Sequence, residues 1–127
     1  MQYTVKSPIL GFEQVECVEL KAIDDLFSTL VDCNGGTMAF TVVNPYLLRE
    51  YSFDVSSELQ ELLGINENSK VLVYNVAVIQ NPLSESCINF LAPLIFNEDN
   101  ATMAQAVLDS AAHPELGIAE PISKFLA

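Results

Sequence analysis

The segment from Ser86 to Asn97 constrains the fold more than any other, because an apolar run typical of a β-strand carries Pro93 in its middle. Proline has no N–H group to donate to a neighbouring strand, so it lies at a sheet edge, at a bulge or at a bend between layers. The polar run Asn97-Glu98-Asp99-Asn100 then predicts a sharp turn. The segment therefore predicts a strand that bends, as strands do in small barrels.

Short apolar segments separated by Pro, Gly and Asn fill most of the chain, which is typical of a mostly antiparallel β domain. Asn34-Gly35-Gly36 predicts a hairpin turn, because Asn and Gly adopt a positive φ at low cost. The aliphatic run at residues 71–79 predicts a strand buried on both faces at the centre of a sheet. Further strands are predicted at residues 2–5, 15–20, 27–32, 37–43 and 102–108.

Helix is the minority element. One short helix is predicted to begin at Ser56 or Ser57, which can cap its free amides, and to end at Gly64. It is too short to be stable alone, so three leucines are expected to pack onto the sheet: Leu59, Leu62 and Leu63. Residues 109–127 form a C-terminal tail, and residues 118–126 predict a second short helix with one apolar side of Ile122, Phe125 and Leu126.

These elements predict a mainly β fold, a small antiparallel barrel-like or folded-over sheet with one or two short helices. A chain of 127 residues is expected to form a single domain, residues 1–127. No apolar run approaches the ~18 residues of a membrane helix, and the N-terminus lacks the apolar core of a signal peptide. We therefore expect a cytoplasmic protein without a membrane partner.

The charge is strongly negative, with 17 acidic residues against five Lys and Arg residues and a formal net charge of −12. Binding to a nucleic-acid backbone relies on clustered Lys and Arg, so direct nucleic-acid binding is not expected. A basic protein partner fits this charge. Charge alone favours the simpler alternative that an acidic surface keeps the chain soluble.

The chain offers little material for an enzyme. It lacks both common glycine-rich phosphate-binding motifs, and its single histidine, His113, precedes a proline in a predicted loop. Cys17, Cys33 and Cys87 are an odd number without a Cys-x-x-Cys pair, so we expect reduced thiols and neither a complete disulfide framework nor a metal site. The sequence predicts no catalytic residue, metal or cofactor.

Four motifs, in order along most of the chain, resemble the FliW family of bacterial flagellar assembly factors. The most specific is the run from Asn89 to Asn97, Asn-Phe-Leu-Ala-Pro-Leu-Ile-Phe-Asn. The others are Gly11-Phe12, the break Asn44-Pro45-Tyr46, and Tyr51-Ser52-Phe53-Asp54. The family often has a basic residue before a His-Pro pair near its end, whereas Ala112 stands there in this chain. The motif residues expected to shape the fold are Gly11, Phe12, Asn44, Pro45, Asn89, Ala92, Pro93 and Asn97.

The resemblance implies a non-enzymatic regulator with two protein partners. Proteins similar to this one bind newly made flagellin like a chaperone and antagonise CsrA, a dimeric RNA-binding repressor of flagellin translation. Accumulating flagellin would occupy the protein and free CsrA to repress. The alternative is an acidic adaptor or chaperone of the β-barrel type, unrelated to flagella.

We hypothesise that the two partners use different surfaces. An acidic face would attract the basic repressor, and the candidates are Glu13, Glu16, Glu19, Asp24, Asp25, Glu98 and Asp99. Apolar residues would hold an amphipathic flagellin segment, and the candidates are Tyr46, Leu47, Leu48 and Phe53. The alternatives are that the acids protect an exposed edge and that most of the apolar residues belong to the core.

Overall fold

The computed structural model of the protein describes residues 1–125. Within them nine strands form one sheet: β1 (Gln2–Ser7), β2 (Cys17–Ala22), β3 (Phe27–Asp32), β4 (Ala39–Val43), β5 (Val71–Val78), β6 (Cys87–Ile88), β7 (Leu94–Asn97), β8 (Thr102–Gln105) and β9 (Glu120–Pro121). The helical elements are α1 (Ser57–Leu63) and the 3-10 helices η1 (Pro45–Leu47), η2 (Leu83–Glu85) and η3 (Ile122–Lys124).

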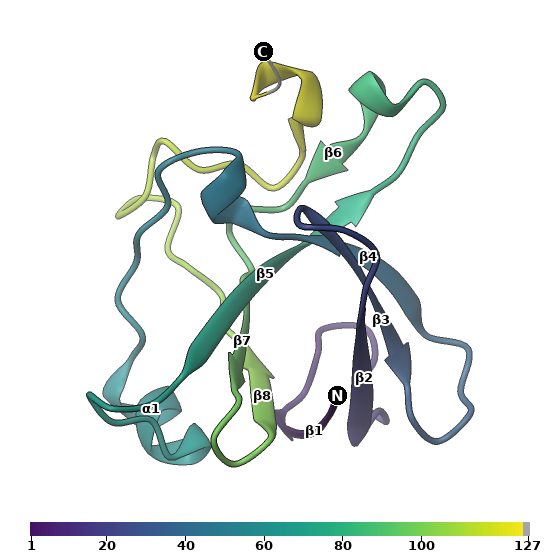
Figure 1. The fold of residues 1–127 in the computed structure, drawn as a ribbon. Helices are drawn as coiled ribbons and strands as arrows, with labels where there is room; N and C mark the ends of the chain where they lie inside the picture. Colours follow the sequence, from purple (N-terminus) through teal and green to yellow (C-terminus); the bar gives the residue numbers. More distant parts are fainter. Residues whose placement is uncertain (126–127) are drawn as a thin grey trace.

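Seven of the strands close into a barrel (Figure 1). They follow one another in the order β4-β3-β2-β1-β8-β7-β5, and β5 pairs with β4 to close the circle. The predicted mainly β, barrel-like fold is therefore confirmed. One pairing departs from the antiparallel pattern, because β8 leaves the β7–β8 turn in the same direction as β1 and pairs with it in parallel.

The segment that contains Pro93 forms two strands, and both pair with β5. β6 lies against Ala77 and Val78 at the end of β5, whereas β7 lies against residues 71–74. Pro93 is buried just before β7, and its carbonyl oxygen accepts a hydrogen bond from the amide of Ala106 at 2.9 Å. The bend predicted at Pro93 is confirmed, and it moves the chain from one part of β5 to another.

The predicted helix is confirmed as α1. The Ser56 hydroxyl accepts a hydrogen bond from the amide of Leu59 at 3.2 Å, and Gly64 ends the helix with a φ of +66°. Leu63 is fully buried against a small cluster with Ile95. Leu62 does not follow the prediction. It is 45% exposed, because this short helix presents only one narrow face to the sheet.

Two apolar clusters stabilise the fold. The first lies inside the barrel and draws on six of its strands, with Tyr3, Leu30, Val42, Phe96 and Met103 among its buried residues. The second covers one end of the barrel and joins the C-terminal tail to it, with Tyr51, Ile88, Phe90, Leu116 and Ile122. The described part of the tail, residues 109–125, is therefore packed onto the domain.

The helix predicted at residues 118–126 is wrong for most of its length. Residues 120–121 form β9, which pairs with β6, and a single 3-10 turn, η3, follows. Pro121 has no amide N–H to donate within a helix. Pairing with β6 instead provides hydrogen-bond partners for the backbone of this segment. Ile122 is buried as predicted and Phe125 packs on Phe90, whereas Leu126 lies outside the described residues.

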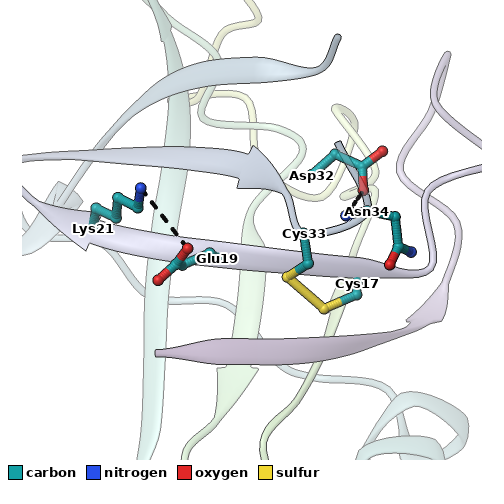
Figure 2. Close-up of a disulfide and its surroundings, with 6 residues drawn as sticks. All are labelled: Cys17, Glu19, Lys21, Asp32, Cys33 and Asn34. Atoms are coloured by element: carbon teal, nitrogen blue, oxygen red, sulfur yellow. Dashed lines mark hydrogen bonds and ion pairs between the residues drawn. A yellow bond between two sulfur atoms is a disulfide. The ribbon is translucent and has the colours of Figure 1, made fainter. Parts of the chain in front are cut away.

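The prediction of three reduced thiols is also wrong, because Cys17 and Cys33 form a disulfide (Figure 2). β2 and β3 pair in antiparallel register with Val18 opposite Asp32, which places Cys17, just before Val18, opposite Cys33, just after β3. The two Cα atoms lie 5.3 Å apart, within the usual range for a disulfide. Cys87 is a free, partly buried thiol.

Candidate protein-binding site

The acidic residues predicted to bind CsrA do not form one cluster. Glu13 and Glu16 precede β2, whereas Asp24 and Asp25 follow it, so a strand of six residues separates the pairs by roughly 20 Å. Glu19 lies within β2, beside Lys21 (Figure 2). The remaining two lie in the β7–β8 turn: Glu98 and Asp99.

Several of these carboxylates already have local partners. Asp24 Oδ1 accepts hydrogen bonds from the backbone amides of residues 26 and 27, at 2.9 and 2.7 Å, and so shapes the β2–β3 turn. Asp99 Oδ2 accepts a hydrogen bond from the Lys70 amide at 3.1 Å, and Glu98 forms an ion pair with Lys70 Nζ at 3.0 Å. Part of the predicted acidic set therefore supports turns.

The four apolar candidates for flagellin separate into an exposed pair and a packed pair. Tyr46 and Leu47, both in η1, are 53% and 57% exposed. Leu48 and Phe53 are partly buried and pack against the cluster at the end of the barrel. Only the exposed pair is free to contact another protein through most of its apolar surface.

Sequence reasoning missed an apolar groove of about 230 Å³ on the outside of the barrel. Ile23, Ile79 and Leu83 line it and are all large, exposed side chains. Such residues were detectable in principle, because Ile23 directly precedes the acidic pair Asp24-Asp25 between β2 and β3, and Ile79 immediately precedes a polar loop. Contiguous exposed apolar residues of this kind mark contact surfaces.

Arg49 ties the η1 end of the barrel to the C-terminal tail. Its guanidinium forms an ion pair with Glu120 Oε2 at 3.1 Å and lies 5.1 and 5.3 Å from the ring centroids of Phe90 and Phe125. Burial alone would raise the pKa of Glu120, but the hydrogen bond and charge of Lys124, with the Gly117 amide and Arg49, lower it below its ordinary value. This network fixes the segment that follows η1.

The polar residues of the family motifs serve the architecture. Asn97 donates a hydrogen bond from Nδ2 to the Leu63 carbonyl oxygen at 2.9 Å, and Asn100 and Thr102 donate to the same oxygen at 2.8 and 3.2 Å. This carbonyl belongs to the last turn of α1, where intrahelical donors end. The other motif residues also lie in turns or at packed positions: Gly11, Phe12, Asn44, Pro45, Asn89, Ala92 and Pro93.

Nothing in the described part of the chain suggests a metal centre, since no three His, Cys, Asp or Glu side chains gather within residues 1–125. His113 Nδ1 lies 3.6 Å from Glu115 on the tail. Over the same residues, none of the helices has the length and apolar character needed to cross a membrane.

A family model described as FliW protein matches residues 1–122. The chain belongs to the FliW family. Flagellar assembly factors FliW 2 and FliW 1 of Wolinella succinogenes are 50% and 46% identical to it, over 98% and 99% of this chain and 92% and 98% of theirs. The FliW of Helicobacter pylori strain G27 is 44% identical over 99% of this chain and 95% of its own.

A solved structure agrees with the family assignment. The crystal structure of the flagellar assembly factor FliW matches the fold with a TM-score of 0.86 at 19% identity, covering 95% of this chain and 84% of that one. The resemblance that the sequence motifs indicated is confirmed, and membership of the FliW family supports a role in flagellar assembly.

Proposed function

We propose that this protein is a non-enzymatic, cytoplasmic flagellar assembly factor that binds newly made flagellin and, when free, binds and antagonises CsrA. The observation that carries the proposal is the family match over residues 1–122, with flagellar assembly factors 44% to 50% identical across nearly the whole chain. Competition between flagellin and CsrA for this protein requires no catalysed reaction. Two affinities and the free concentrations of the partners set which complex forms.

The charge of the chain supports a basic partner. A net charge of −12 attracts a protein whose surface must hold RNA phosphates, and such steering raises association rates by ~10 to 10³-fold at low salt. All seven predicted acids, including Glu19 and Asp25, contribute to this long-range field whatever their local contacts. A CsrA association rate that stays flat as salt rises would refute the electrostatic part of the proposal.

The exposed pair in η1 supports the proposed flagellin contact. Tyr46 and Leu47 place two apolar side chains in solvent on a segment that Asn44 and Arg49 hold in place. An amphipathic flagellin segment would lay its apolar face there, beside Leu48 and Phe53, which pack against the cluster at the end of the barrel.

The test is a competition between purified partners. Flagellin and CsrA from the same genome are titrated separately into the protein, and preformed complex with CsrA is then challenged with flagellin. We expect both to bind and flagellin to displace CsrA. Binding of neither partner would reject the proposal and favour an acidic adaptor unrelated to flagella.

A matched pair of variants tests the apolar contact. Leu47→Ala is expected to weaken flagellin binding about tenfold. The exposed leucine would be buried at the centre of the contact, and alanine removes most of that apolar area. Leu10→Ala is the control, since Leu10 is similarly exposed but lies outside η1. Equal flagellin affinity for the two variants, both folded by thermal melting, would contradict a contact at η1. Tyr46→Ala provides a second reading of the same site.

A further inference from the structure

A groove of about 470 Å³ lies outside the barrel, beside α1. One wall is α1 and the segment that leads into it, and the other is the end of β8 and the residues that follow; Figure 1 shows α1 next to β8. We call this the α1–β8 groove and define it by Asp54, Glu58, Leu59, Leu62, Gln105 and Val107.

Two aliphatic residues of the groove lining are exposed to solvent. Leu62, on α1, is 45% exposed, and Val107, two residues after the end of β8, is 66% exposed. Leu59 continues the same surface inward, where it packs against the cluster beneath α1. A partner that buried these side chains would remove apolar area from water, which is the main favourable term in association.

Two carboxylates border this apolar surface. Asp54 and Glu58 are both exposed, and neither forms an ion pair or a side-chain hydrogen bond with any residue of the described part of the chain. The other polar lining is uncharged, and no Lys, Arg or His among residues 1–125 lines the groove. No cationic side chain of the described residues therefore neutralises these carboxylates, whereas Glu98 pairs with Lys70.

We propose that the α1–β8 groove binds a segment of the basic partner, with one or more aliphatic side chains on Leu62 and Val107 and a Lys or Arg on Asp54 and Glu58. This rests on the proposed function, in which the basic partner is the CsrA repressor. A second copy of this chain is disfavoured because it carries the same net charge of −12.

The groove also adjoins part of the predicted acidic set. The Leu10 amide donates a hydrogen bond to Gln105 Oε1 at 2.9 Å, so the chain that follows β1 passes beside the groove. Glu13 and Glu16 lie farther along this same connection, whereas the β2–β3 turn lies beyond the far end of β2. The contact region for CsrA therefore consists of the groove and the β1–β2 connection, without Asp24 and Asp25.

The experiment compares variants that neutralise carboxylates in the groove with variants that neutralise exposed carboxylates outside it. The double variant Asp54→Asn/Glu58→Gln is expected to weaken CsrA binding about five- to tenfold and to flatten its salt dependence. Glu61→Gln/Glu67→Gln is the matched control, because it also neutralises two exposed carboxylates and neither of them lines the groove. Val107→Ser is expected to weaken CsrA binding about fivefold, with Ile118→Ser as an exposed aliphatic control.

Dissociation constants for CsrA and for flagellin are measured for each folded variant. The inference is supported if only the groove variants lose CsrA affinity and all retain flagellin affinity. It is overturned if the groove variants bind CsrA as their controls do, or if they lose flagellin instead, and either result leaves the proposed function standing. A wild-type protein that does not bind CsrA overturns both.

Discussion

Replacing Tyr51 with Phe tests how the end of the barrel is stabilised. Tyr51 is 6% exposed, and its hydroxyl donates a hydrogen bond to the Phe90 carbonyl oxygen at 2.5 Å. The same hydroxyl accepts a hydrogen bond from Asn75 Nδ2 at 3.2 Å, and Asn75 is fully buried in β5. Tyr51→Phe leaves the carbonyl oxygen without this donor, which costs about 1 to 3 kcal/mol of unfolding free energy.

The pH dependence makes this prediction specific. Burial raises the pKa of Tyr51 to about 12, from an ordinary value of 10.0, although Asn75 and Arg49 oppose the shift. Because the folded pKa is the higher one, the phenol contributes its full stability below pH 10. The contribution then falls by about 1.4 kcal/mol per pH unit as the unfolded chain loses its proton first.

Urea unfolding of wild type and Tyr51→Phe at pH 8, 9, 10 and 11 measures both effects. We expect a difference of about 2 kcal/mol at pH 8 that shrinks by about 1 kcal/mol between pH 10 and 11. Burial also raises the pKa values of Tyr3 and Tyr46, but these residues are common to both proteins and cancel in the difference. A difference that stays constant from pH 8 to 11 would refute the reasoning.

Three further changes probe other parts of the fold. Glu120→Gln is expected to cost about 1 to 3 kcal/mol in urea unfolding at pH 7, since it uncouples Arg49. Because the pKa of Glu120 is lowered in the folded state, that cost should fade as the pH drops below 4.5. Replacing Cys17 and Cys33 by Ser removes a cross-link over a separation of 16 residues and should cost about 3 kcal/mol under oxidising conditions. Gly64→Ala should lower the free energy of unfolding by about 1 to 2 kcal/mol, because φ of Gly64 is +66° and the new Cβ would lie 2.8 Å from Asn100 Nδ2.

Each of these changes has its own control. A Glu120→Gln cost that persists unchanged at pH 3 would contradict the linkage. The serine variant should match reduced wild type, and equal stability of oxidised and reduced wild type would argue against the disulfide. Gly35→Ala separates strain from crowding, because Gly35 also has a positive φ, +81°, but no atom within 4 Å of the new Cβ. Equal costs at Gly35 and Gly64 would mean that Asn100 moves aside freely.

The sequence predicted the locally determined parts of the fold well. β3 matches its predicted residues 27–32, and α1 begins and ends where Ser56 and Gly64 indicated. The bend at Pro93 was also readable, because a missing N–H and a fixed φ act on the residue itself. The FliW motifs were found by the same kind of reading, over short runs of residues.

The candidate site could be predicted only in part. Sequence offered Tyr46, Leu47, Leu48 and Phe53 as one apolar group, and burial separated them into an exposed and a packed pair. The same reasoning predicted that Leu62 packs in the core, whereas in the structure it lines an exposed groove. Composition gives the number of apolar side chains, but the direction of each depends on what packs beside it.

By itself, the sequence determined the strongly acidic charge, the short strands and their turns, the bounds of one helix and the family. Those features depend on residue chemistry and on conformations set within a few positions. Tertiary structure alone decided that Cys17 meets Cys33, that β8 pairs in parallel with β1, and that Asp54 and Val107 border the same groove. Each of these needs a strand register or a barrel closure, which packing between distant segments sets.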